Sequence, residues 1–245
     1  MRNGIFLRKG AACVVLAATT TILTGCASLT SHKENDPLEA MNRSIYQFNE
    51  KADEYVAEPL AKGYQYVTPE FVDRGISNFF NNLDDVTVFI NDILQLKLNQ
   101  ALSDGARLVV NSTVGVIGFM DIATGMGLPK HHEDFGQTLG SYGLGTGPYI
   151  VLPILGPSTL RDTAGLYADS FVDPIQQIEE SDEMWATYTL KGVDARADLI
   201  STKKIVDDAS LDPYEFMRSG YFQRREYLVY DGNPPLDDEE FLDDE

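Results

Sequence analysis

The sequence predicts a mostly α-helical fold. Two segments, 36–39 (DPLE) and 212–215 (DPYE), place an Asp before a Pro and a Glu three residues after the Asp. Such capping boxes mark helix starts, because the Asp side chain accepts backbone N–H bonds and Pro lacks the N–H that a first helical turn leaves unpaired. Apolar residues recur at intervals of three and four, and no run of period-two alternation predicts a strand.

The first 25 residues have the features of a secretory signal peptide. Arg2, Arg8 and Lys9 form a positive n-region, and residues 11–23 form an apolar stretch too short to span a bilayer. The stretch ends in the segment 23–26 (LTGC), which resembles the lipobox of bacterial lipoproteins. In that class the cysteine is acylated and becomes the first residue of the mature chain. An ordinary signal peptide followed by a chance cysteine is the alternative.

The cysteine count supports a lipid anchor at Cys26. The other cysteine, Cys13, lies in the segment that signal processing would remove. The mature body would then have no internal disulfide, no thiolate metal site and no cysteine nucleophile. Several acyl chains would anchor Cys26 firmly, since each buried methylene contributes about 0.8 kcal/mol. We expect no cofactor besides this covalent lipid. Ala27 at the next position resembles outer-membrane sorting signals of enterobacterial lipoproteins.

Composition and charge divide the chain into four segments. We expect a lipoprotein signal peptide at 1–25, a polar tether at 26–35, one helical domain at 36–230 and an acidic, disordered tail at 231–245. The formal net charge of −19 repels nucleic-acid phosphate, so nucleic-acid binding is excluded as a function.

The first predicted helix carries one apolar stripe. At 100° per residue its members fall within about a 100° arc, and the charged residues lie outside that arc. The stripe consists of Leu38, Met41, Ile45, Phe48, Ala52 and Tyr55. The next segment, 69–83, groups its apolar residues on one face in the same way. Periodicity leaves two interpretations open, because such a stripe packs either against a protein core or against acyl chains in a membrane interface.

Two later segments are apolar but irregular. Residues 106–128 contain Asn111, Asp121 and several glycines, which makes a transmembrane helix a poor interpretation. Residues 142–157 (YGLGTGPYIVLPILGP) hold four glycines and three prolines among aliphatic side chains. A hydrophobic segment that cannot form a regular helix is either a loop buried in the core or the lining of a cavity, because lipid cannot pair its free backbone groups.

The sequence predicts neither an enzyme nor a metal site. His32, His131 and His132 form no pattern of zinc ligands. The segment 139–143 (LGSYG) lacks the first glycine of a hydrolase nucleophile elbow, and all three histidines precede its serine. The segment 143–147 (GLGTG) lacks the Lys-Ser/Thr ending of a phosphate-binding loop.

An ordered set of short segments resembles the MlaA (VacJ) family of lipoproteins. The set covers about residues 35–228 without a large gap, and its specificity lies in the order of the segments. They are 36–39 (DPLE), 42–49 (NRSIYQFN), 75–79 (GISNF), 135–140 (FGQTLG), 145–149 (GTGPY), 152–153 (LP), 160–162 (LRD), 212–214 (DPY) and 221–224 (YFQR). The acidic tail lies outside the resemblance.

The resemblance implies a ring of amphipathic helices around a central channel, embedded in the periplasmic leaflet of the outer membrane. It implies that mislocalised phospholipids leave the outer leaflet through this channel and pass to the periplasmic carrier MlaC. It also implies association with a trimeric outer-membrane porin. The alternative is a lipoprotein scaffold that bridges porins and periplasmic partners without transporting lipid.

Within this interpretation we expect specific roles for two groups of residues. Leu38, Met41, Ile45 and Phe48 are expected to face lipid. Three glycines at alternate positions favour a mobile hinge beside the channel, because glycine reaches positive φ without strain. These are Gly143, Gly145 and Gly147, and Tyr149, Leu152 and Leu155 are expected to belong to the apolar channel wall. Structural turns without a hinge function are the alternative for the glycines.

Overall fold

The computed structural model describes residues 36–203 and 210–235. The expectations for the signal peptide, the tether with Cys26 and the tail beyond residue 235 therefore lie outside the described residues. The prediction of a mostly α-helical fold is confirmed for the described residues. Its helices are α2 (Glu39–Ala52), η1 (Asp53–Ala57), α3 (Glu58–Val67), α4 (Glu70–Leu94), α5 (Leu98–Thr113), α6 (Ile122–Gly125), α7 (Phe135–Ser141), α8 (Leu160–Asp169), η2 (Pro174–Gln177), α9 (Ser181–Asp198) and α11 (Pro213–Val229).

The predicted capping box at 212–215 lies at a helix start, whereas the prediction that Asp36 caps the first helix was wrong, because α2 begins at Glu39 and its N-cap residue Leu38 makes no side-chain cap bond. Asp212 accepts bonds from the backbone N–H groups of Tyr214 and Glu215 at 3.1 and 3.3 Å and so caps α11. Asp36 accepts the N–H of Leu38 at 3.0 Å, one turn before α2 begins. From there α2, the π-helical turn η1 and α3 follow one another without a break and form one long rod.

A short β-hairpin interrupts the helical pattern, and the expectation that no strand forms was wrong. Strand β1 (Tyr149–Leu152) pairs antiparallel with β2 (Gly156–Thr159), with Tyr149 opposite Thr159. Four-residue strands give too few alternations to be visible in sequence. The turn between them takes φ of +67° at Ile154 and +84° at Gly156.

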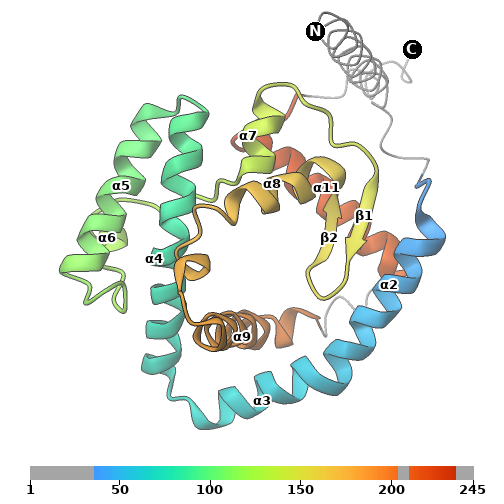
Figure 1. Cartoon of the computed structure of the whole chain (residues 1–245), viewed down its shortest axis with the longest axis horizontal. Coiled ribbons are helices and arrows are strands. Elements are labelled where there is room, and N and C mark those ends of the chain that lie inside the picture. Colours follow the sequence, from blue (N-terminus) through green and yellow to red (C-terminus); the bar gives the residue numbers. More distant parts are fainter. Residues whose placement is uncertain (1–35, 204–209, 236–245) are drawn as a thin grey trace, which may run out of the picture.

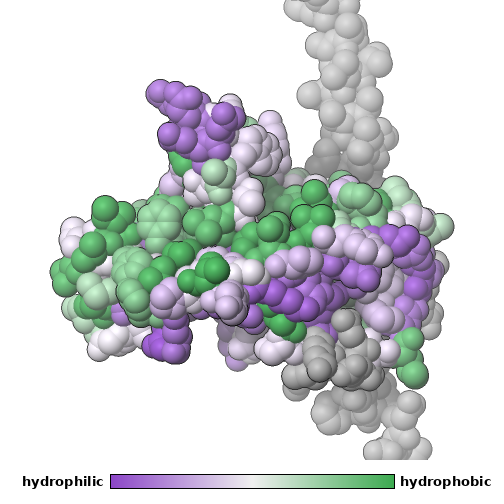
Figure 2. Space-filling model, turned by 90° about the horizontal axis from the view of Figure 1, so that it is seen from below, coloured by the Kyte–Doolittle hydropathy of each residue, from purple (hydrophilic) through white to green (hydrophobic). Residues whose placement is uncertain are grey.

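The elements lie in a flattened arrangement (Figure 1, Figure 2). Figure 1 shows α2 and α3 along one edge, α4 and α5 side by side on the opposite side, and α9 seen nearly end-on inside that outline. Helices α7, α8 and α11 gather beside the hairpin. The main buried apolar cluster is small: Tyr149, Val151 and Tyr214, with Ile45 among the side chains packed against it. Within the described residues, no helix is both long enough and apolar enough to cross a membrane.

Candidate functional site

The surface of this protein is rich in large apolar side chains. Among the described residues ten hydrophobic side chains are buried, whereas thirty-five large hydrophobic ones are exposed. Figure 2 shows a broad hydrophobic band across one face, with hydrophilic residues to its right and a hydrophilic projection above it. Soluble monomers rarely expose such large contiguous apolar patches. The apolar residues of this protein are therefore distributed mainly over its surface.

The interior is correspondingly polar. Seventeen polar or charged side chains are buried among the described residues, and several of them are completely inaccessible. Buried polar groups are costly unless they are hydrogen-bonded. Two clusters, one between α4 and α5 and one between α7, α8 and α11, account for most of these charges.

The α4–α5 cluster is rich in carboxylates. Its charged members are Asp85, Asp92, Asp104, Asp121 and Glu133, with Lys97, Arg107 and Lys130. Asp85 is fully buried between Lys130 and the Arg107 Nε at 3.6 Å. His131 Nδ1 lies 2.8 Å from a carboxylate oxygen of Asp104. Burial raises the pKa of Asp92 to about 8, and the neighbouring Asp104 carboxyl contributes to the increase. Anionic groups therefore outnumber cations here.

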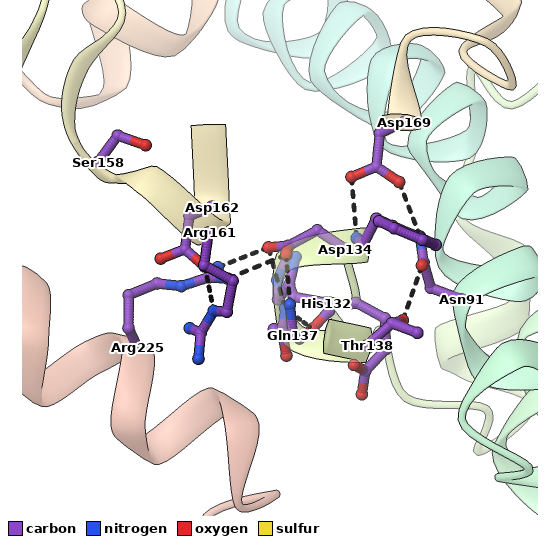
Figure 3. Close-up of polar contacts among 12 residues, drawn as sticks. Asn91, His132, Asp134, Gln137, Thr138, Ser158, Arg161, Asp162, Asp169 and Arg225 are labelled. Carbon is purple, nitrogen blue, oxygen red and sulfur yellow. Dashed lines mark hydrogen bonds and ion pairs between the residues drawn. The ribbon is translucent and has the colours of Figure 1, made fainter. Parts of the chain in front are cut away.

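The α7–α8–α11 cluster is balanced in charge (Figure 3). Its members are Asp134, Arg161, Asp162, Tyr221 and Arg225. Arg225 donates to Asp134 at 2.5 and 2.9 Å and to Asp162 at 3.0 Å, and Arg161 donates to Asp162 at 2.9 Å. Burial alone would raise the pKa values of Asp134 and Asp162, but Arg225 holds both below their ordinary range. The helices here approach closely, since a Cβ on Gly165 would lie 2.4 Å from the Gly136 nitrogen.

Two asparagines of α2 fasten the hairpin to the long rod. Asn42 Nδ2 donates to the Tyr149 carbonyl at 3.0 Å, and its Oδ1 accepts the Val151 N–H at 2.9 Å. Seven residues later, Asn49 repeats the pattern with the Leu152 carbonyl at 2.9 Å and the Ile154 N–H at 2.7 Å. Each side-chain amide thus pairs with β1 as a neighbouring strand would.

The expected lipid-facing stripe is divided between two environments. Met41 and Phe48 are exposed, at 45% and 55%. Leu38 is half-buried, and Ile45 packs against the core cluster. The exposed members point to the periphery, whereas Ile45 connects α2 to the hairpin.

The expected hinge and wall residues also occupy different environments. Gly143 and Gly147 have φ of +83° and +68°, and Gly143 and Gly145 are exposed. The carbonyl of Thr146 accepts the Arg161 N–H at 3.1 Å, so the end of the segment is bonded to α8. Of the expected wall, Tyr149 is buried in the core cluster, Leu152 is half-buried and Leu155 is exposed in the hairpin turn.

An apolar cavity of about 620 Å³ lies beside α4, away from the expected hinge. Its walls come from the apolar face of segment 69–83, from the loop between α5 and α6, and from η2 and α9. The lining residues are Ile76, Phe79, Phe80, Leu83, Val116, Phe119, Pro174, Ile175, Ile178, Ala186, Thr187 and Leu190. The stripe of segment 69–83 was visible in the sequence, but its partners, 33 to 114 residues away, carry no signal that would associate them with it.

The described residues hold no cluster of three or more His, Cys, Asp or Glu side chains that could bind a metal ion. Their chemistry is that of apolar surfaces supported by buried ion pairs.

Comparisons with known proteins agree with this architecture. Residues 34–228 match the family model described as MlaA lipoprotein. The chain is 37% identical over 224 residues to the intermembrane phospholipid transport system lipoprotein MlaA of Escherichia coli K12, covering 89% of this chain and 88% of the relative. The Haemophilus influenzae protein of the same name is 34% identical, covering 91% and 92%.

A solved structure from work on the maintenance of bacterial outer-membrane lipid asymmetry superposes with a TM-score of 0.72. It is 31% identical in sequence, and the match covers 80% of this chain and all of that one. Family model, sequence and fold therefore agree: this chain belongs to the MlaA lipoprotein family.

Proposed function

We propose that this protein removes mislocalised phospholipids from the outer leaflet of the outer membrane and passes them to a periplasmic carrier. The observation that carries the proposal is the inverted distribution of polarity, with apolar side chains at the periphery and buried charges inside. Its relatives in E. coli and H. influenzae are named as lipoproteins of an intermembrane phospholipid transport system. No catalytic step is required of such a protein.

The same polarity supports embedding in a single leaflet. Many large apolar side chains are exposed, and none of the described helices could span a membrane. We therefore infer that the body lies flat with its edge among acyl chains. An acylated Cys26 would hold it at the periplasmic side of the outer membrane. Exposed aromatic side chains such as Tyr55, Phe71 and Trp185 suit the boundary between acyl chains and head groups.

Photocrosslinking tests this placement of the α2 stripe. A photoreactive residue at position 48 is expected to label phospholipid, because Phe48 is exposed, whereas one at position 45 is expected to label the protein itself. Equal lipid labelling at both positions would contradict the division of the stripe. Mass spectrometry of the labelled chain gives the measurement.

A channel through the body would give phospholipids their path. We infer that the elements surrounding α9 in Figure 1 form the expected ring and that segment 142–148 is the hinge beside its channel. The exposed backbone of Gly143 and Gly145 supports hinge motion at this end of the segment, while the bond from Arg161 to Thr146 fixes the other end. The expected recipients and partners are MlaC and a trimeric porin.

Substitution Gly145→Val separates transport from scaffolding. Gly145 is exposed and its φ is not positive, and the branched side chain of valine would stiffen the hinge. We expect normal abundance and porin association but accumulation of outer-leaflet phospholipid, as in a strain lacking the protein. If the deletion strain keeps normal lipid asymmetry, the protein is a scaffold and the proposal fails. If the deletion strain loses lipid asymmetry but Gly145→Val keeps it, segment 142–148 is not a hinge and the transport proposal is retained.

A further inference from the structure

The loop between α5 and α6 adopts a backbone conformation that its residues disfavour. Val116 and Ile117 have φ of +56° and +58°, followed by Gly118 at +84°. A positive φ is a real outlier for a β-branched residue, because the branched Cβ crowds the backbone. Both side chains are exposed, at 60% and 67%, so their own packing does not offset the strain. Contacts elsewhere must hold the loop in place.

Those contacts come from the end of α5 and from one face of α4. On the α5 side, the N–H groups of Ile117 and Gly118 donate to the carbonyls of Ser112 and Asn111 at 3.1 and 2.8 Å. The Phe119 ring lies directly against Gly75, where an added Cβ would be 2.1 Å from the ring atoms. Asn78 Nδ2 donates to the Phe119 carbonyl at 3.2 Å. Gly118 abuts the Asn82 side chain at a distance that leaves no room for a Cβ. One aromatic ring, one hydrogen bond and two close glycine contacts therefore hold a strained loop against α4.

The same loop forms one wall of the 620 Å³ apolar cavity. Val116 and Phe119 line it opposite η2 and α9, and Thr187 contributes the one polar side chain of the lining. A site of this volume lies within the roughly 300–1,000 Å³ typical of small-molecule pockets. Because the lining offers no charged group, it excludes a phosphate head group and suits a hydrocarbon. The exposed apolar residues Val114 and Ile117 continue this apolar surface outside the cavity.

We propose that the cavity holds one acyl chain of a phospholipid and that loop 114–120 is a latch that opens to admit it. This inference rests on the proposed lipid-transport function. In the latched state Phe119 sits on Gly75, while Val116 and Ile117 remain strained. Opening loses the ring contact and releases that strain while the loop stays bonded to α5, so the two changes oppose each other and a passing chain can shift the balance between the states.

The single tryptophan provides the measurement of occupancy. Trp185 is the one tryptophan of the chain and directly precedes Ala186 of the cavity wall. Quenching of its fluorescence by 9,10-dibromostearic acid, measured on the mature protein in detergent, is expected to saturate. Ala186→Phe fills the cavity and is expected to weaken probe binding about tenfold. The matched control is Ala195→Phe, an exposed position on the same helix outside the lining, which should bind the probe normally.

A pair of glycine substitutions tests the latch. Gly75→Ala displaces the Phe119 ring and is expected to speed probe entry about tenfold in stopped-flow quenching. Gly63→Ala is the control, since its added Cβ meets nothing within 4 Å. If Gly75→Ala unfolds the protein, the double variant Gly75→Ala/Phe119→Ala makes room for the Cβ. This variant should show the faster rate of probe entry. Val116→Gly relieves strain in the latched state and should slow entry.

Two results would overturn the inference. Equal quenching by Ala186→Phe and Ala195→Phe would show that the probe contacts Trp185 from the micelle and not from the cavity. Unchanged entry rates in Gly75→Ala, Phe119→Ala and Val116→Gly would show that the loop is a static turn. Lipid asymmetry in cells with and without the wild-type protein is a separate measurement. Failure of the cavity proposal would therefore leave the transport proposal intact.

Discussion

The two buried charge clusters differ in how their buried carboxylates are paired with cations. Between α7, α8 and α11, Arg161 and Arg225 match Asp134 and Asp162 one for one. Between α4 and α5, five carboxylates share Lys97, Arg107 and Lys130. The first cluster lowers the pKa values of its carboxyl groups, whereas burial raises those of Asp85 and Asp92 in the second. The carboxylates of the balanced cluster thus stay charged and paired near neutral pH. In the carboxylate-rich cluster, Asp92 gains or loses a proton in that range.

Removing the central cation of the balanced cluster is expected to have the largest effect. Arg225→Met leaves Asp134 and Asp162 buried without their shared guanidinium, which costs about 3–5 kcal/mol when one partner of a buried pair is lost. Thermal unfolding in detergent gives the measurement. Arg224→Met is the control, since the neighbouring arginine is exposed and its loss should change stability by about 0.5 kcal/mol or less. Similar losses in both variants would remove the distinction between the clusters.

Asp92 is expected to make stability depend on pH in the opposite direction to Asp134 and Asp162. Its pKa is raised from the ordinary value near 4 to about 8 in the folded protein, so the folded state binds the proton more tightly. The resulting stabilisation is complete below pH 4 and is lost as the pH rises to 8, at up to about 1.4 kcal/mol per pH unit. Asp134 and Asp162 have lowered pKa values, so the stabilisation they contribute is present at neutral pH and is lost only in acid.

Asp92→Asn tests this assignment. Asp92 and Asp104 each keep a buried oxygen that lacks a hydrogen-bond partner among the described residues, so a proton shared between the two carboxyl groups would satisfy both. An amide mimics the protonated form, and we expect the variant to flatten the fall in unfolding temperature between pH 5 and 8. The exposed Asp182→Asn should retain the wild-type profile. If the unfolding temperature of Asp92→Asn falls with pH as steeply as that of the wild type, the pH dependence comes from other groups.

Much of this organisation was predictable, and the limits are physical. The helix start at Asp212 follows from local capping, which a sequence displays directly. The family segments 160–162 and 221–224 contain three members of the α7–α8–α11 cluster, and Asp134 and Arg225 directly flank such segments. The short motifs do not reveal that Asp162 bonds with Tyr221 and Arg225. Contacts between residues so far apart in the chain leave no periodic pattern.

The hairpin and the cavity show the same limit. Strand β1 is stabilised by asparagines more than 100 residues earlier, so nothing in segment 149–152 itself separates a strand from an irregular loop. The stripe in segment 69–83 correctly placed Ile76 and Phe80 on one apolar face, yet only the fold brings Val116 and Leu190 to it. Exposure likewise divided the α2 stripe, because the hairpin covers Ile45 but not Phe48.

The asparagine contacts of α2 also bear on the risk of misassembly. A two-stranded sheet leaves each strand one side whose N–H and C=O groups can recruit a strand of another molecule and begin aggregation. Asn42 occupies two such groups of β1, at Tyr149 and Val151, and Asn49 bonds Leu152 at the end of the strand and Ile154 in the turn. In a protein with this much exposed hydrophobic surface, helix α2 thus covers a strand edge that could otherwise pair with another copy.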